Sequence, residues 1–114
     1  MLDSNSNNAW LAGILEGEGS FISKTKLSIS VAMTDQDVIE RLSTLTGVGR
    51  VYALGRQKGH HKDVWRWTIY RRAHLKSITE AVLPWLGKRR TVAAQALLDR
   101  IAHDDARGSS EPAA

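Results

Sequence analysis

The spacing of apolar positions changes several times along the chain, and each change predicts a new element. Apolar residues recur at helical spacing from 7 to 17, and Gly19 is expected to end this helix. From Ser20 the spacing becomes two. Apolar residues alternate with small or polar ones over 27–33, which predicts a half-buried strand joined by a short hairpin to an earlier strand at 20–24.

The second half of the chain repeats this alternation of helix and paired strands. Thr34 or Asp35 can cap the next helix, and Gly47 can end it. The expected elements are helices over 35–46, 73–86 (bent or ended by Pro84) and 88–105, with strands over 50–56 and 64–70.

The order is therefore helix, two strands, helix, two strands and then two helices. Two hairpins in this order predict an α+β fold of the αββαββα type, in which helices cover one face of a four-stranded antiparallel sheet. Residues 1–6 are expected to be flexible, 7–103 to form the domain and 104–114 to be a disordered tail. Alternate strand residues point to the open face. The residues expected there are Lys24, Lys26, Ser28, Ser30, Arg50, Tyr52, Arg56, Arg66, Thr68 and Tyr70, and Lys58 of the turn between the last two strands is expected beside them.

Composition narrows the class of protein. With 114 residues, of which 42% are hydrophobic, the chain fits one domain. It has no cysteine and no apolar run long enough for a membrane span, so we expect an intracellular protein that is neither secreted nor bound to a membrane. Residues 50–76 carry eight Lys or Arg and a single acid, Asp63. Such a block either faces a nucleic acid or is a solvated basic surface, and charge alone does not decide between them.

The first helix ends in an unusual stretch, "LAGILEGEG". Gly13 and Gly17 lie four residues apart on one strip, where glycine costs ~1 kcal/mol relative to alanine. A second helix approaching this strip would explain them, and the alternative is that the helix is simply a weak one. Glu16 and Glu18 stand at the negative end of the helix dipole, where a carboxylate needs a compensating cation. Two copies paired through the glycines would bring two Glu18 side chains together, and Mg²⁺ prefers such hard oxygen ligands.

This stretch closely resembles the nine-residue signature of the LAGLIDADG homing endonucleases, with glutamates in place of the two aspartates. The resemblance extends over residues 8–102 and includes "TGVGRVY" and "LPWLGKRR". It implies a homodimer that cleaves both strands of double-stranded DNA at a specific site, using Mg²⁺ or Mn²⁺. It further implies that Glu18 is the catalytic metal ligand and that Gly17 supplies a carbonyl ligand. By the same resemblance Glu16 is more often structural than metal-binding, and the expected dimer interface is Ala12, Gly13, Glu16 and Gly17.

The resemblance also suggests catalytic roles further along the chain. Family members place a basic residue near the scissile phosphates at the start of the last helix, and here Lys88 or Arg89 takes that position. Asp35 matches a polar position that orders water near the metals, although it is also a good helix cap. The first hairpin is shorter than in the well-studied members, which implies fewer contacts to DNA.

Two other functions remain open from the sequence. One is a DNA- or RNA-binding protein of the same fold that has lost cleavage, such as a maturase or a transcriptional regulator. The other is an interaction domain without nucleic acid, which the basic open face disfavours. His60 and His61 suggest a metal pair only weakly, because they lie in a polar turn without companion ligands.

Overall fold

The structure is a computed structural model that describes residues 4–56 and 62–108. Helices and strands follow one another in the expected order. The helices are α1 (Ser4–Glu18), α2 (Gln36–Thr46), α3 (Arg72–Val82) and α4 (Lys88–Gly108), with a short 3-10 helix η1 (Leu83–Trp85) before α4. The strands are β1 (Gly19–Ile22), β2 (Ser28–Met33), β3 (Arg50–Arg56) and β4 (Asp63–Ile69).

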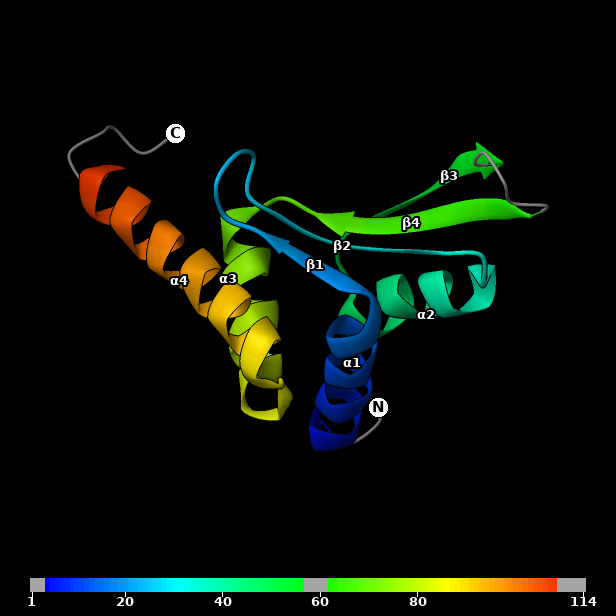
Figure 1. The fold of residues 1–114 in the computed structure, drawn as a ribbon, viewed down its shortest axis with the longest axis horizontal. Helices are drawn as coiled ribbons and strands as arrows, with labels where there is room; N and C mark the ends of the chain where they lie inside the picture. The colour runs from blue at the N-terminus through cyan, green and yellow to red at the C-terminus, as the bar shows by residue number, and fades with distance from the viewer. Residues whose placement is uncertain (1–3, 57–61, 109–114) are drawn as a thin grey trace.

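The four strands form one antiparallel sheet in the order β1-β2-β4-β3. Figure 1 shows α1, α2 and α3 beneath one face of this sheet, while α4 runs obliquely away beside α3. No helix among the described residues covers the opposite face. The expected fold class, with its helix-covered face and its open face, is thus confirmed.

The core lies between the sheet and the helices because alternate strand residues point to that side. Trp67 is fully buried at the centre of the sheet, opposite Val31 on one side and Val51 on the other. Its indole Nε1 donates a hydrogen bond to the Val48 carbonyl at 3.0 Å, which satisfies the polar end of a buried aromatic side chain. The adjacent Gly49 has a φ of +94° and leaves no room for a Cβ against this indole.

Two helix ends agree closely with the sequence prediction. Gly47 follows α2 with a φ of +70°, the left-handed conformation that glycine adopts without strain. Pro84 falls within η1, so α3 ends at Val82 as expected.

Several boundaries differ from the prediction. Helix α1 begins at Ser4, so residues 4–6 are helical, and α4 continues to Gly108, into the segment expected to be a disordered tail. Gly19 is not a helix cap but the first residue of β1, which follows α1 directly. A Cβ at Gly19 would lie 2.6 Å from the Leu15 carbonyl oxygen, and this close approach explains the glycine better than a stop signal does.

Candidate active site and nucleic-acid interface

The two acids at the end of α1 have different surroundings. Glu16 Oε1 accepts a hydrogen bond from the Gly87 backbone N–H at 2.6 Å, just before the first residue of α4. In return, Arg90 Nε donates to the Glu16 carbonyl oxygen at 3.0 Å. The negative end of α1 therefore meets the positive end of α4, an arrangement that favours both charges.

These contacts give Glu16 a structural role within the chain, as the resemblance implied, and its place in a dimer interface stays a prediction. Its carboxylate does not need a metal ion, because the N-terminus of α4 already compensates its charge. Its partner is 71 residues away in sequence, which is why a reading of the local pattern did not find it. Arg90, the third basic residue of the "GKRR" segment, was not predicted to have a role, yet it makes the second contact between the two helices.

Glu18 has a different environment. It is the last residue of α1, its side chain is exposed, and no hydrogen bond or ion pair to it occurs within residues 4–56 and 62–108. Lys88 and Arg89, also exposed, are the first two residues of α4. Because Glu16 binds Gly87, Glu18 lies two residues from one side of this contact and Lys88 one residue from the other. Glu18 therefore ends the helix whose last turn contacts the start of α4, where Lys88 and Arg89 stand, and no contact between Glu18 and either cation is found among the described residues.

Asp35 lies at the same end of the β1–β2 pair as Glu18. Strand β1 begins directly after Glu18, Gly19 pairs with Val31, and Asp35 follows the end of β2. The Asp35 side chain is exposed and makes no capping hydrogen bond; only its carbonyl accepts bonds from the first turn of α2. Asp35 is therefore available at this end of the sheet, and the structure gives it no contact with Glu18.

A divalent ion fits this site in part. The Glu18 carboxylate and the carbonyls of the last turn of α1, including that of Gly17, are hard oxygen donors, and such carbonyls lack intrahelical partners. Within the described residues, however, no group of three or more His, Asp or Glu side chains gathers to hold a metal ion. The described part of one chain therefore offers Glu18 and backbone carbonyls but not a complete set of ligand side chains.

The predicted dimer strip is exposed in two of its four residues. A Cβ at Gly13 or Gly17 would meet nothing within 4 Å, so this part of α1 is bare. Ala12, by contrast, is 1% exposed and packs in the chain's own core, which corrects its assignment to the interface. It was misplaced because it shares a face with Leu11 and Leu15, both of which are also buried.

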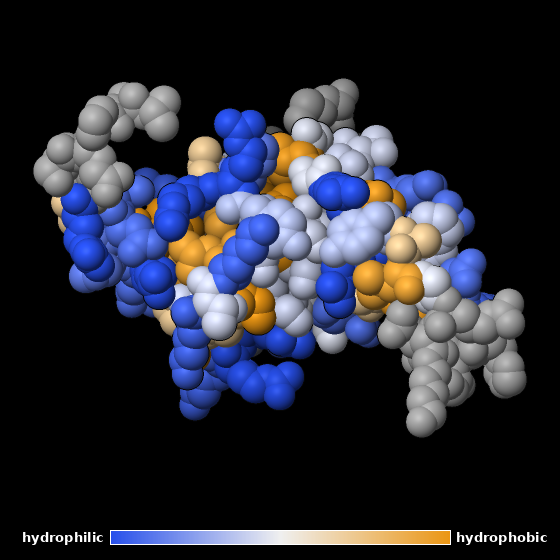
Figure 2. Space-filling model, turned by 90° about the horizontal axis from the view of Figure 1, so that it is seen from above, coloured by the Kyte–Doolittle hydropathy of each residue, from blue (hydrophilic) through white to orange (hydrophobic). Residues whose placement is uncertain are grey.

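The open face of the sheet carries no carboxylate among the strand residues that point to it. Ser30, Thr68 and Arg50 form one row across three strands, and Tyr52 and Arg66 face each other in the next. Figure 2 shows this face, with hydrophilic side chains among smaller apolar patches. The residues that alternation places on it are Ser20, Ile22, Ser28, Ser30, Ala32, Arg50, Tyr52, Val64, Arg66 and Thr68.

Two predicted residues of this face lie elsewhere. Lys24 and Lys26 belong to the loop between β1 and β2 (residues 23–27), because β1 ends at Ile22 and not at residue 24. Both lysines are exposed, and Lys26 Nζ lies 4.3 Å from the centre of the Tyr70 ring.

Arg56 ends β3, beyond an irregularity between Ala53 and Gly55 that shifts the register. Lys58, His60 and His61 lie outside the described residues.

Long side chains on β3 and β4 interact with one another on the open face. The hydroxyl of Thr68 lowers the pKa of Tyr52, burial acts in the opposite direction, and Arg66 adds a further lowering. Thr68 Oγ1 is itself buried and has no hydrogen-bond partner of standard geometry in the described part of the chain. Arg66 Nε is likewise buried without a hydrogen-bond partner there, so two polar atoms beneath this face are unsatisfied.

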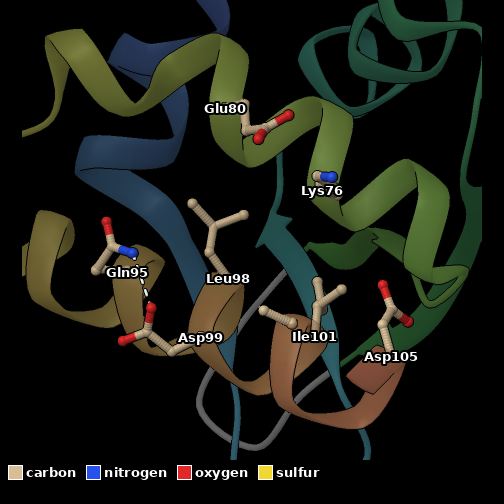
Figure 3. Close-up of a pocket in the computed structure, with 8 residues that line it drawn as sticks. Lys76, Glu80, Gln95, Leu98, Asp99, Ile101 and Asp105 are labelled. Carbon is tan, nitrogen blue, oxygen red and sulfur yellow. Dashed lines mark hydrogen bonds between the residues drawn. The ribbon is translucent and has the colours of Figure 1, made fainter. Parts of the chain in front are cut away.

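A groove between α3 and α4 lies apart from this region. Its volume is about 500 Å³, and Figure 3 shows Lys76 and Glu80 of α3 facing residues of α4, among which Gln95 Nε2 donates to Asp99 Oδ1 at 2.9 Å. Its carboxylates belong to Glu80, Asp99 and Asp105 and do not converge on a metal site. We assign no function to it.

The fold is shared with solved endonucleases. The homing endonuclease I-CvuI, solved on a DNA target with magnesium present and the DNA uncleaved, superposes with a TM-score of 0.69 at 18% identity, over 87% of this chain and 68% of that chain. This chain has the homing endonuclease fold. The group I intron-encoded I-CeuI, solved with DNA, gives 0.67 at 17% identity over 94% of this chain and 60% of that one.

A third homing endonuclease, I-TnaI, gives a TM-score of 0.62 at 20% identity and covers 89% of this chain and 76% of the other. The expected resemblance to the LAGLIDADG endonucleases is thus confirmed at the level of the fold. No family model and no curated protein matches the sequence. None of the helices in the described ranges is long and apolar enough to cross a membrane.

Proposed function

We propose that this chain is a site-specific double-strand DNA endonuclease that acts as a homodimer with a divalent metal ion. The observation that carries the proposal is Glu18, an exposed carboxylate with no partner among the described residues, at the end of the helix whose Glu16 contacts Gly87, next in sequence to the exposed cations Lys88 and Arg89. A protein that only binds DNA gains nothing from a carboxylate near phosphates, whereas hydrolysis of a phosphodiester needs one to hold metal ions.

The open face supports DNA as the substrate. Its cations lie on the last two strands, and no acid points to it from the strands. Several solved proteins of this fold are DNA complexes, including I-CvuI and I-CeuI. Arg50 and Arg66 are the long side chains with which the face would read base edges, since arginine can bind guanine through two hydrogen bonds.

In this reading each residue has a defined part. Glu18 and the Gly17 carbonyl would hold Mg²⁺ or Mn²⁺, which polarises the scissile phosphate and lowers the pKa of a bound water when present. Lys88 or Arg89 stabilises the negative charge that builds on the phosphate in the transition state. Asp35 orients water at the same end of the sheet. Gly13 and Gly17 let a second copy of α1 approach closely and complete the site.

The test is Glu18→Gln, which removes the charge and keeps the shape. Glu80→Gln on α3 is the matched control, because it makes the same charge change at an exposed acid away from the site. Cleavage of a plasmid library with Mg²⁺, read by sequencing the cut ends, should be abolished only in Glu18→Gln. DNA binding should be retained or tightened, because a negative charge near phosphates is lost.

A second readout does not depend on activity. In the metal-free protein, Glu18→Gln should be slightly more stable than wild type, by about 0.3–1 kcal/mol, because it relieves an acid at the negative end of α1. Mg²⁺ should stabilise wild type and leave the variant unchanged. Equal loss of folding and binding would make Glu18 structural. Binding without cleavage by wild type would favour the cleavage-deficient nucleic-acid-binding protein.

A further inference from the structure

A small basic pocket lies at one end of the open face, outside the strands. Its volume is about 210 Å³, and its walls come from the β1–β2 loop, the end of β4 and both C-terminal helices. The lining residues are Thr25, Lys26, Leu27, Tyr70, Arg72 and Arg100. Tyr70 follows β4 directly, so the pocket continues the surface that the proposed function assigns to DNA.

Three cations line this pocket, and the carboxylate of Asp104 offsets one of their charges. Asp104 Oδ2 lies 2.9 Å from Arg72 Nη1, and Asp104 Oδ1 lies 3.1 Å from Arg100 Nε. Lys26 makes no ion pair within the described residues and rests on the Tyr70 ring. With Asp104 counted against Arg72, Arg100 and Lys26, the cluster keeps a net charge of +2, which suits an anion.

The cluster is also held in place. Asp104 fixes the two guanidinium groups relative to each other, and Arg100 Nη1 donates to the Ser23 carbonyl at 3.3 Å, which ties α4 to the β1–β2 loop. Cations whose positions are set before binding lose less conformational entropy when a ligand arrives. A solvated surface with independent lysines would lack these ties.

We propose that this pocket binds a backbone phosphate of the DNA beyond the edge of the sheet. The assignment rests on the proposed function, because it extends the DNA track from the open face to Arg72 and Arg100. It also gives the short first hairpin a role: its loop supplies Lys26 to a phosphate contact where strands of only four and six residues offer little reach. The ligand chemistry is a phosphate group, whose sources are a DNA backbone or free inorganic phosphate.

The test compares Lys26→Gln and Arg72→Gln with Lys76→Gln, which removes the same charge from an exposed lysine of α3 outside the pocket. Binding of each protein to a random-sequence duplex is measured over a range of salt concentrations. The logarithm of the binding constant falls as the logarithm of the salt concentration rises. Each pocket variant should make this slope less steep by about 1 for each chain bound, and Lys76→Gln should leave it unchanged. Thermal unfolding of all variants checks that the fold is kept.

The outcomes separate this proposal from the function on which it rests. If wild type binds no DNA, the proposed function and the pocket assignment both fail. If wild type binds and the pocket variants behave like Lys76→Gln, the pocket assignment alone is wrong. An NMR titration with inorganic phosphate is the second arm. If phosphate changes the chemical shifts of Lys26 and Arg72 while the pocket variants keep the wild-type salt dependence of DNA binding, the pocket is a site for free anions. That result would overturn the assignment to DNA.

Discussion

The contact between Glu16 and Gly87 makes a prediction that reaches from stability to activity. This hydrogen bond of 2.6 Å and the return bond from Arg90 are the described hydrogen bonds that join the end of α1 to the start of α4. Glu16→Ala removes the carboxylate and leaves the Gly87 N–H without its acceptor. Glu16→Gln keeps an acceptor of the same shape and removes only the charge.

The magnitude follows from the geometry. A hydrogen bond to a charged group contributes about 1.5–3 kcal/mol when well buried. The bond to Gly87 is exposed to water, so the lower range that applies to helix N-caps, about 0.5–2 kcal/mol, is appropriate. A chain of this size loses roughly 5 °C in Tm for each kcal/mol. Glu16→Ala should therefore lower Tm by roughly 3–10 °C, and Glu16→Gln by about half as much.

Gly87→Ala gives an independent check on the same contact. A Cβ at Gly87 would lie 3.3 Å from both carboxylate oxygens of Glu16, so the side chain would have to shift. In the Glu16→Ala background that crowding is gone, and the two substitutions should be non-additive by at least about 0.5 kcal/mol. Thermal or urea unfolding measures all four proteins. A wild-type Tm in Glu16→Ala, or strict additivity in the cycle, would refute the role of this bond.

Two further variants test other contacts. Gly13→Ala, at a bare position of α1, should raise the stability of an isolated chain by up to about 1 kcal/mol. If two copies meet at Gly13, the same substitution should weaken their association. Sedimentation and the dependence of Tm on protein concentration distinguish the two effects. For Asp104, burial raises the pKa, but Arg100 and then Arg72 outweigh it and leave the pKa below its ordinary value. The Asp104 carboxylate therefore stabilises the fold above its unfolded-state pKa, and this stabilisation is lost as pH falls through its folded-state pKa. In urea unfolding, an Asp104→Asn variant should differ from wild type at neutral pH but not in strong acid. A difference that persists in strong acid would exclude this ion-pair explanation.

Local patterns were enough to predict most of the fold. The alternation in β3 and β4 gave strand positions within one residue, because one side of each strand is buried against helices. Gly47 and Pro84 act through backbone conformation alone, so their effects can be read without knowledge of the rest of the chain. The first hairpin was less certain because residues 23–27 contain no glycine or proline to mark the turn, and two lysines were consequently placed on the sheet.

The site was predictable where a single segment carries it and not where distant segments meet. The acids of α1 and the basic start of α4 could each be found from sequence. Their contact through Glu16 and Gly87 could not, since it depends on how α1 and α4 pack. The same reason explains why Arg72 and Arg100 were missed: they belong to two helices that converge on the β1–β2 loop only in the folded chain.

The difference between the two acids of α1 is itself an argument for function at Glu18. Both stand at the negative end of a helix, where a carboxylate is unfavourable by about 0.3–1 kcal/mol unless something compensates it. Glu16 has that compensation within the chain, from the Gly87 amide at the start of α4. Glu18 has none among the described residues, so a neutral side chain there would give a more stable monomer. An unfavourable charge that no contact in the structure compensates is expected at a functional site. A bound cation is the ligand that would compensate the carboxylate of Glu18.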